Sequence, residues 1–219
     1  MPCKACIFDL DGTLLDTLAD LALACNTIMA RHGWPAHETE KYRLFVGNGF
    51  ARLMERVVPA SVLPTLAPEE LNALVREAKD FYAAHLWEQT MPYEGIPDAL
   101  QDLAARGIRL GLLSNKPDSE TQLLARHFFP DRFDAVAGSR PGVPLKPDPA
   151  ALYAMLATLS VSPDETVYVG DSNVDMQTAR NAGIFSVGVA WGFRGAEELP
   201  QAGAGRIISR PAELLDLLS

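Results

Sequence analysis

Short apolar runs recur along the chain, and each is too short to form a helix. They span residues 5–8, 109–113, 135–137, 166–169 and 185–190, with a weaker run at 206–208. Most are separated by segments in which apolar residues recur at helical spacing, such as Leu152, Met155, Leu156 and Leu159. Strands that alternate with helices indicate crossover connections, which join parallel strands into a sheet covered on both faces. The pattern therefore predicts an α/β fold with a doubly wound, Rossmann-like parallel sheet.

The first two runs are separated by about a hundred residues, far more than one crossover helix needs. Within that interval, apolar stripes at helical spacing over residues 18–29, 50–58 and 71–85 indicate helices. We expect residues 17–92 to form an inserted helical domain. Residues 1–16 and 93–219 then form the main, Rossmann-like domain, with hinges near residues 14–16 and 93–95.

Composition and charge narrow the class of partner. A hydrophobic content of 48% with 21% charged residues excludes a disordered chain. No apolar run approaches the ~18 residues of a membrane-spanning helix, so we expect no membrane partner. The N-terminus fits a first strand and not a secretory signal, which favours a cytoplasmic location. A net charge of -9 argues against nucleic acid and means that an anionic substrate needs a metal ion and a few placed cations.

Two carboxylates follow the first predicted strand. Asp9 and Asp11 stand two apart in the segment "FDLDGT", so they project the same way just past the end of the strand. Such a pair is tolerated where a cation binds it or where one member holds a proton, and both conditions suit phosphoryl transfer. A calcium loop needs its glycine at the sixth position, whereas Gly12 is fourth. Surface aspartates at a turn remain the alternative.

Three further strand ends carry polar groups that a phosphate site requires. Ser114 offers a hydroxyl and Asn115 a main-chain amide, although this residue pair also suits an ordinary turn. Lys146 follows in a loop with four prolines, where it is either solvated or a point charge for a phosphate. Asp171 and Asp175 begin a predicted helix, where acidic residues also serve as caps.

These side chains converge in only one kind of fold. In a doubly wound sheet, ligands bind at the carboxyl ends of the strands, at the point where the strand order reverses. If the first and fourth predicted strands are neighbours, Asp171 faces Asp9 and Asp11. The sequence thus predicts a phosphate and metal site at that edge.

Four segments in order, "DLDGTLLDT", "LLSNK", "LKPDP" and "GDSNVD", resemble the motifs of the haloacid dehalogenase-like hydrolases. The resemblance covers nearly the whole chain, and the helical insert is similar to that family's cap. It implies that Asp9 attacks phosphorus and that Asp11 protonates the leaving oxygen and then activates water. The remaining implied roles are phosphoryl binding by Ser114, Asn115 and Lys146, Mg²⁺ binding by Asp9, the Asp11 carbonyl and Asp171, and support from Gly12, Thr13 and Asp175.

Less specific sequence features bear on the substrate. An aspartate at position 11 favours phosphate esters, because branches of the family that cleave carbon–halogen or carbon–phosphorus bonds do not keep it. The segments "LFVGNGF", "MPYEGI", "SNKPD" and "GVAWGFR" resemble phosphoglycolate phosphatases, so the expected partner is a small phosphorylated metabolite such as 2-phosphoglycolate. Arg43 and Arg52 are candidates to meet a substrate carboxylate, against the alternative of a solvated helix face.

Two other functions remain open. A phosphosugar mutase would use the same Asp9 intermediate, although that branch carries a serine–arginine pair where this chain has Gly49 and Phe50. A non-catalytic phosphate-binding protein would have lost a catalytic carboxylate, and none is lost here. The sequence leaves open whether the protein is a monomer or a homodimer, and whether Asp175 contacts the metal or only Lys146.

Overall fold

The computed structural model describes residues 3–217. Within this range the chain divides into two compact units, and the second of them is Thr17–Thr90. The first unit combines the chain before Thr17 with the chain from Met91 onward. The division thus returns to the first unit at Met91, whereas the sequence pattern places the return at residue 93.

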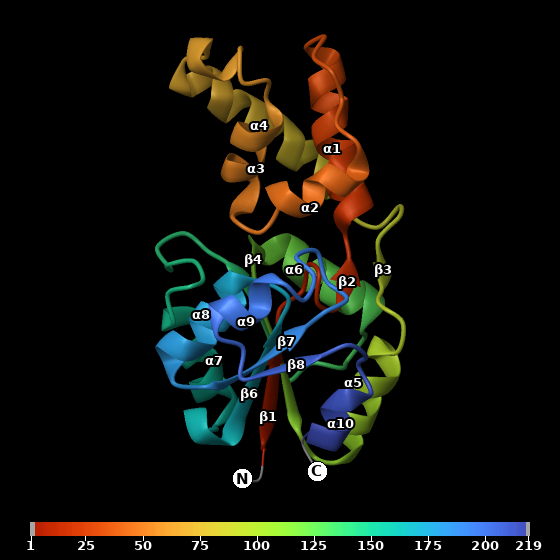
Figure 1. The fold of residues 1–219 in the computed structure, drawn as a ribbon, viewed down its shortest axis with the longest axis vertical. Coiled ribbons are helices and arrows are strands. Elements are labelled where there is room, and N and C mark those ends of the chain that lie inside the picture. Colours follow the sequence, from red (N-terminus) through yellow and green to blue (C-terminus); the bar gives the residue numbers. More distant parts are fainter. Residues whose placement is uncertain (1–2, 218–219) are drawn as a thin grey trace. The chain divides into compact units, whose positions relative to one another are not determined.

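A parallel sheet forms the centre of the first unit (Figure 1). Among the described residues it has six strands in the order β5-β4-β1-β6-β7-β8. Their bounds are Ala5–Phe8 for β1, Arg109–Pro117 for β4, Ala135–Ser139 for β5, Thr166–Gly170 for β6, Phe185–Val189 for β7 and Arg206–Ile208 for β8. Neighbouring strands all pair in parallel. The predicted doubly wound α/β class is confirmed.

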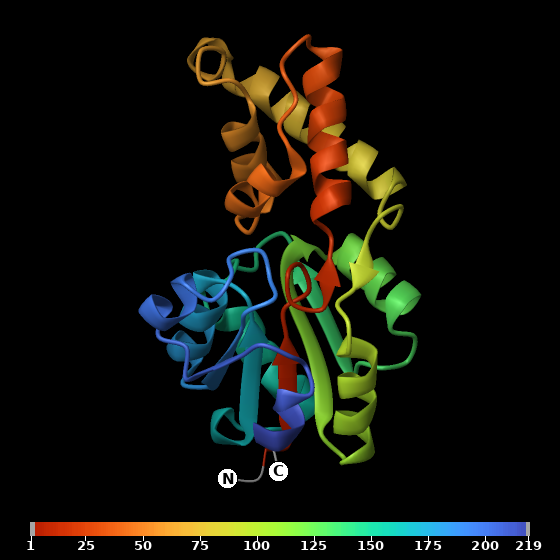
Figure 2. The same cartoon turned by 45° about the vertical axis from the view of Figure 1, so that its right-hand side comes forward.

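Helices cover both faces of this sheet. They are α5 (Ile96–Ala105), α6 (Asp118–Phe128), α7 (Ala150–Leu159), α8 (Asn173–Ala182), α9 (Glu198–Ala202) and α10 (Glu213–Leu217). Figures 1 and 2 show α7 and α8 on one face and α5 and α10 on the other. On the first face Ile7, Met155 and Tyr168 belong to one buried apolar cluster. Because both faces are covered, a central strand such as β1 is apolar along its whole length.

The strand order reverses at β1. This strand pairs with β4 on one side and with β6 on the other, so that Phe8 lies opposite both Leu112 and Val169. The predicted adjacency of the first and fourth runs, residues 5–8 and 166–169, is therefore confirmed. The carboxyl ends of β4, β1 and β6 lie side by side at one edge of the sheet.

Strand β4 is longer than the apolar pattern indicates. It continues from the predicted end at residue 113 to Pro117, with an irregularity in its pairing to β5 between Leu113 and Pro117. The segment Ser114 to Lys116 is therefore extended, and the ordinary turn considered for it is not formed. Polar residues continue the strand here because they lie beyond the apolar core.

The second unit is helical. Its elements are α1 (Leu18–Arg31), α2 (Tyr42–Phe45), α3 (Gly49–Val57) and α4 (Pro68–Ala84), with short 3₁₀ turns at Thr39–Lys41 and Leu63–Thr65. Helix α4 packs against both α1 and α3, and buried residues such as Ile28, Met54 and Leu74 form the core of the unit. No helix in the described range has the length and apolar character that crossing a bilayer requires.

Short-range contacts join the segments at the domain boundary. Strands β2 (Leu15–Asp16) and β3 (Met91–Pro92) form a small antiparallel pair, which is too short to leave an apolar pattern in the sequence. Within the second unit, the buried carboxylate of Asp20 accepts hydrogen bonds from the main chain of Gln89 and Thr90 and from the Thr90 hydroxyl. The beginning of α1 is thereby tied to the end of that unit.

Candidate active site

Asp9 directly follows β1 and begins a tight loop. Its main-chain N–H donates to the Val169 carbonyl at 2.9 Å, and its Oδ1 accepts from the Leu10 N–H at 2.7 Å. The loop turns at Gly12, which has a φ of +83°. A Cβ at this position would lie 2.4 Å from Asp171 Oδ2, so both the backbone conformation and the available space require glycine. The loop thereby brings Asp9 close to the end of β6.

Three buried aspartates meet at this edge. Asp9, Asp171 and Asp175 each offer an oxygen, and these oxygens lie within 4.8 Å of one another. Burial, followed by the charge of Asp175, raises the pKa of Asp9 to about 7 against the opposing effect of Lys146. Burial, followed by the charges of Asp175 and Asp9, raises the pKa of Asp171 well above its ordinary value. Clustered carboxylates of this kind resist joint ionisation unless a cation binds them, and oxygen donors are the ligands that Mg²⁺ prefers.

Lys146 is the cation of this cluster. Its Nζ lies 2.9 Å from Asp9 Oδ1 and 2.8 Å from Asp175 Oδ1. The ammonium group also donates to the Tyr168 hydroxyl and the Leu113 carbonyl. Burial alone would lower the pKa of Lys146, but the carboxylates of Asp175 and Asp9 more than offset it and hold that pKa well above its usual range. Lys146 therefore stays charged beside the Asp9 carboxylate.

Asn115 fixes the position of Lys146 in a way that the sequence did not indicate. Its side-chain Oδ1 accepts from the Lys146 main-chain N–H at 2.8 Å, and its Nδ2 donates to the Lys146 carbonyl at 3.1 Å. This reciprocal pair joins the end of β4 to the proline-rich loop. The donor role predicted for the Asn115 main-chain amide stays a prediction.

Asp175 has two roles in the structure. One oxygen contacts Lys146, and the other accepts from the Ser172 hydroxyl at 2.6 Å at the beginning of α8. Asp175 thus caps its own helix and orients Lys146 while also lying in the acidic cluster.

Two further residues that the sequence analysis assigned to the site, Ser114 and Thr13, are buried. Ser114 is buried, and its Oγ accepts from the Lys116 N–H at 3.1 Å. Thr13 is also buried, and its hydroxyl has no hydrogen-bond partner among the described residues. A buried hydroxyl without a partner costs about 1–3 kcal/mol, which a ligand oxygen or a water molecule would offset.

Comparison with known proteins identifies the family. Residues 6–189 match the model of the haloacid dehalogenase-like hydrolases. The phosphoglycolate phosphatase of Vibrio parahaemolyticus is 32% identical, with 99% of this chain and 96% of the relative covered. The N-acetylmuramic acid 6-phosphate phosphatase of Pseudomonas aeruginosa is also 32% identical, with 100% and 96% covered. A protein from Lactobacillus delbrueckii subsp. bulgaricus, whose crystal structure is described as that of a phosphoglycolate phosphatase, is 33% identical. The two structures superpose with a TM-score of 0.92, over 100% of this chain and 99% of the other.

The chain is a haloacid dehalogenase-like hydrolase. The predicted resemblance is therefore confirmed, and with it the expectation that the chain is an enzyme similar to phosphatases over nearly its whole length.

The hydrolase has a second lysine at the site, which the sequence analysis did not assign. Lys116 lies in the quoted segment "LLSNK", and its Nζ contacts Asp11 Oδ1 at 2.8 Å and Asp11 Oδ2 at 2.9 Å. The Asp11 side chain is not part of the cluster that the other three aspartates form in the described part of the chain. The assignment of the Asp11 main-chain carbonyl to the metal stays a prediction.

The segment after β7 also supports the site. The Phe193 N–H donates to Asp171 Oδ2 at 2.7 Å, and the Trp191 indole N–H donates to the Thr13 carbonyl at 3.0 Å. A Cβ at Gly192 would lie 2.2 Å from the Asp171 Cβ. The sequence showed this segment only as part of a family resemblance, because its contacts depend on tertiary structure.

The two candidate specificity arginines lie in the second unit of the hydrolase. Arg43 Nε lies 2.6 Å from Glu40 Oε2, and Arg52 Nη1 lies 2.5 Å from Glu55 Oε2. Ion pairs at the surface contribute only about 0–1 kcal/mol, so a substrate anion can compete with these glutamates. A third arginine, Arg56, donates to the Phe45 carbonyl and to Asn48 Oδ1, and so holds the loop before α3.

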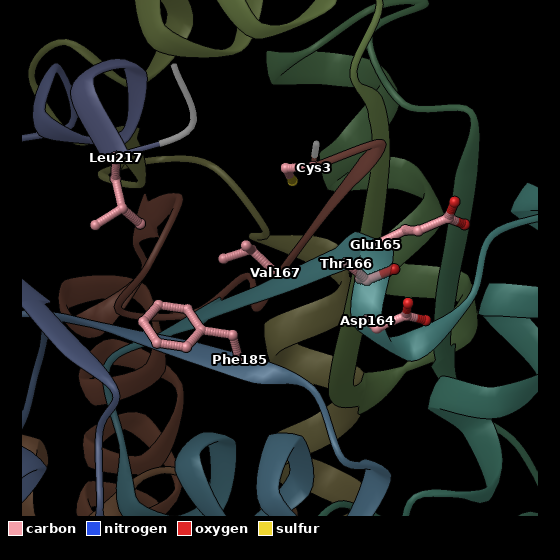
Figure 3. Close-up of a pocket in the computed structure, with 7 residues that line it drawn as sticks. All are labelled: Cys3, Asp164, Glu165, Thr166, Val167, Phe185 and Leu217. Atoms are coloured by element: carbon pink, nitrogen blue, oxygen red, sulfur yellow. The ribbon is translucent and has the colours of Figure 1, made fainter. Parts of the chain in front are cut away.

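A hollow at the opposite edge of the sheet has no such chemistry (Figure 3). It lies where β6 and β7 begin, with Val167 and Phe185 on one side and Asp164 and Glu165 on the other. Its lining is Cys3, Asp164, Glu165, Thr166, Val167, Phe185 and Leu217. This set contains no cationic side chain that would bind a phosphate.

Proposed function

We propose that this hydrolase is a Mg²⁺-dependent phosphatase that cleaves small phosphate monoesters through a phosphoryl group carried on Asp9. The observation that carries the proposal is the contact of 2.9 Å between the Asp9 carboxylate and the buried Lys146 ammonium group. A cation held there binds the phosphoryl oxygens and offsets the repulsion between the attacking carboxylate and the substrate.

The chain's own residues account for both half-reactions. An Asp9 oxygen attacks phosphorus, the bond from phosphorus to the ester oxygen breaks, and Asp11 gives its proton to the departing alcohol. Asp11 then takes a proton from a water molecule, which attacks the phosphoryl group and releases inorganic phosphate and the free Asp9 carboxylate. Ser114 and Lys146 bind the phosphoryl oxygens throughout.

The charges of the site support a divalent cation. The carboxylates of Asp9, Asp11, Asp171 and Asp175 face the ammonium groups of Lys116 and Lys146, which leaves two negative charges uncompensated when all four are ionised. Asp9, Asp171 and the Asp11 carbonyl would hold Mg²⁺, with Asp175 behind them. The bound ion would supply positive charge for the phosphoryl oxygens.

The packing of Phe50 supports hydrolysis over a mutase reaction. Its ring is buried in the second unit, with its centroid 5.5 Å from that of Tyr82. The phosphoglucomutase-type branch has an arginine at this position, whereas the hydrolase has a core side chain. The arginine usual in that branch is therefore replaced here by a buried apolar ring.

The names of two relatives support a proposal for the substrate class. One is named for phosphoglycolate and another for N-acetylmuramic acid 6-phosphate. Both compounds carry a carboxylate in addition to the phosphate. We therefore assign to this enzyme phosphorylated carboxylic acids, with Arg43 and Arg52 as the residues that recognise the acid.

Two matched substrate pairs test this assignment. We expect 2-phosphoglycolate to be cleaved with a higher kcat/KM than 2-hydroxyethyl phosphate, and N-acetylmuramic acid 6-phosphate with a higher kcat/KM than N-acetylglucosamine 6-phosphate. A charge-assisted contact to the carboxylate predicts about a tenfold or larger difference within the preferred pair. Steady-state kinetics with excess Mg²⁺ provide the measurement.

The arginines are tested with the same substrates. Arg43→Ala or Arg52→Ala should raise KM for the preferred acid and leave KM for an aryl phosphate without a carboxylate unchanged. Arg76→Ala, at an exposed position of α4, is the matched control. If the sugar phosphate without a carboxylate is cleaved fastest and both variants behave like the parent, the substrate class and the arginine contacts are both wrong.

A further inference from the structure

Lys116 is fixed opposite the second aspartate of the site. Its Nζ contacts both oxygens of Asp11, and its side chain is only 3% exposed, whereas that of Asp11 is 22% exposed. The main chain of Lys116 is also held, because its N–H donates to Ser114 Oγ and its carbonyl accepts from the Thr121 hydroxyl. Both the side chain and the main chain of Lys116 are thus held in place at the carboxyl edge of the sheet.

The two lysines separate the aspartates into two groups. Lys146 contacts Asp9 and Asp175, which belong to the acidic cluster. Lys116 contacts Asp11, whose carboxylate lies outside that cluster as far as the described residues show. Asp11 is only two residues from Asp9, so a rotation of its side chain would otherwise be free to add a fourth carboxylate to the cluster.

We propose that Lys116 is a positioning residue, which holds the Asp11 carboxylate away from the acidic cluster and toward the ester oxygen that leaves. This inference rests on the proposed phosphatase function. Two charge-assisted hydrogen bonds to one carboxylate fix its rotation as well as its place. Proton transfer requires the acid to lie within hydrogen-bond reach of the leaving oxygen. Loss of the Lys116–Asp11 contact should therefore impair protonation of the leaving group more than phosphoryl binding.

The leaving group provides the test. Lys116→Met keeps the length of the side chain and removes its charge. We expect kcat for an alkyl phosphate, whose leaving oxygen needs a proton, to fall by about 10- to 100-fold, a part of the 10²- to 10⁴-fold that acid–base catalysis contributes. An aryl phosphate with an acidic phenol needs little protonation and should lose less than about threefold.

The control is Lys4→Met, which removes a lysine from an exposed ion pair with Glu165 at the other edge of the sheet. Its kcat should equal that of the parent for both substrates. A double-mutant cycle then separates positioning from general damage. If Lys116 acts through Asp11, Lys116→Met should cost little further kcat for the alkyl phosphate once Asp11→Asn is present.

A crystal structure of the metal-free Lys116→Met protein gives a readout that does not depend on activity. We expect the Asp11 carboxylate to leave its parental position.

Four outcomes would each overturn the inference. They are equal losses of kcat for both substrates, losses that multiply in the double mutant, an Asp11 that does not move, and a rise in KM confined to acid substrates. A parent enzyme that cleaves no phosphate ester would instead remove the proposed function, whereas an active parent with an unchanged leaving-group profile in the variant removes this inference alone.

Discussion

Removal of divalent metal ions should abolish turnover by this enzyme. The site has two uncompensated negative charges when its aspartates are ionised, and a phosphate monoester adds more. A metal ion contributes several kcal/mol of charge stabilisation in such reactions, so we expect a loss of about 10³-fold or more. The measurement is kcat after exhaustive dialysis against EDTA, followed by titration with Mg²⁺. Full activity in the dialysed enzyme would refute the metal assignment, and failure of Mg²⁺ to restore it would point to damage by the dialysis.

Metal binding should depend on pH. Burial and the Asp175 charge raise the pKa of Asp9 from 3.8 to about 7 in the metal-free protein. The folded protein therefore holds this proton more tightly than the unfolded chain, and its free energy of unfolding falls as the pH rises from about 4 to about 7. Mg²⁺ competes with the same proton, so its affinity should decrease as the pH falls below about 7.

Titration calorimetry of Mg²⁺ in two buffers with different enthalpies of ionisation measures the proton that is released. We expect release near pH 6, where Asp9 is protonated before the metal binds. An affinity that stays constant between about pH 5.5 and 7.5 would show that Asp9 does not bind a proton in competition with the metal.

Asp9→Asn should remove turnover without unfolding the protein. An amide cannot attack phosphorus to give an acyl phosphate, and loss of a nucleophile commonly costs on the order of 10⁴-fold or more in kcat. Lys146 keeps its contacts with Asp175 and Tyr168, and the substitution relieves repulsion among the aspartates. The variant should therefore melt no lower than the parent in the absence of metal. Asp98→Asn, at an exposed position of α5, is the matched control and should retain full kcat.

The sheet could be predicted because its strands lie in the core. β1 was predicted at its observed bounds, since apolar residues occupy the whole strand and the polar Asp9 follows it. The bounds of β8 were also predicted, from Ile207 and Ile208, although this strand begins with the exposed Arg206. The extension of β4 through Ser114 to Lys116 could not be predicted in the same way. Those residues serve the site and not the core, so hydrophobicity does not mark them as a strand.

The groups of the candidate site were predictable and their contacts were not. Parallel topology places Asp9 and Asp171 at one edge, whichever rotamers they adopt. The pairing of each lysine with a carboxylate depends on side-chain depth and direction, which sequence spacing does not contain. For this reason the Asp11–Lys116 contact and the two hydrogen bonds between the Asn115 side chain and the Lys146 main chain were both missed.

Chemical trapping of the phosphorylated enzyme tests the central claim most directly. The enzyme is mixed with Mg²⁺ and a substrate labelled in its phosphoryl group, quenched with acid within one turnover, and digested for mass spectrometry. We predict phosphate on the peptide that contains Asp9, bound as an acyl phosphate that hydroxylamine removes, and no label in Asp9→Asn. Label on a serine or a histidine, or a parent enzyme that turns over without any label on Asp9, would contradict the account.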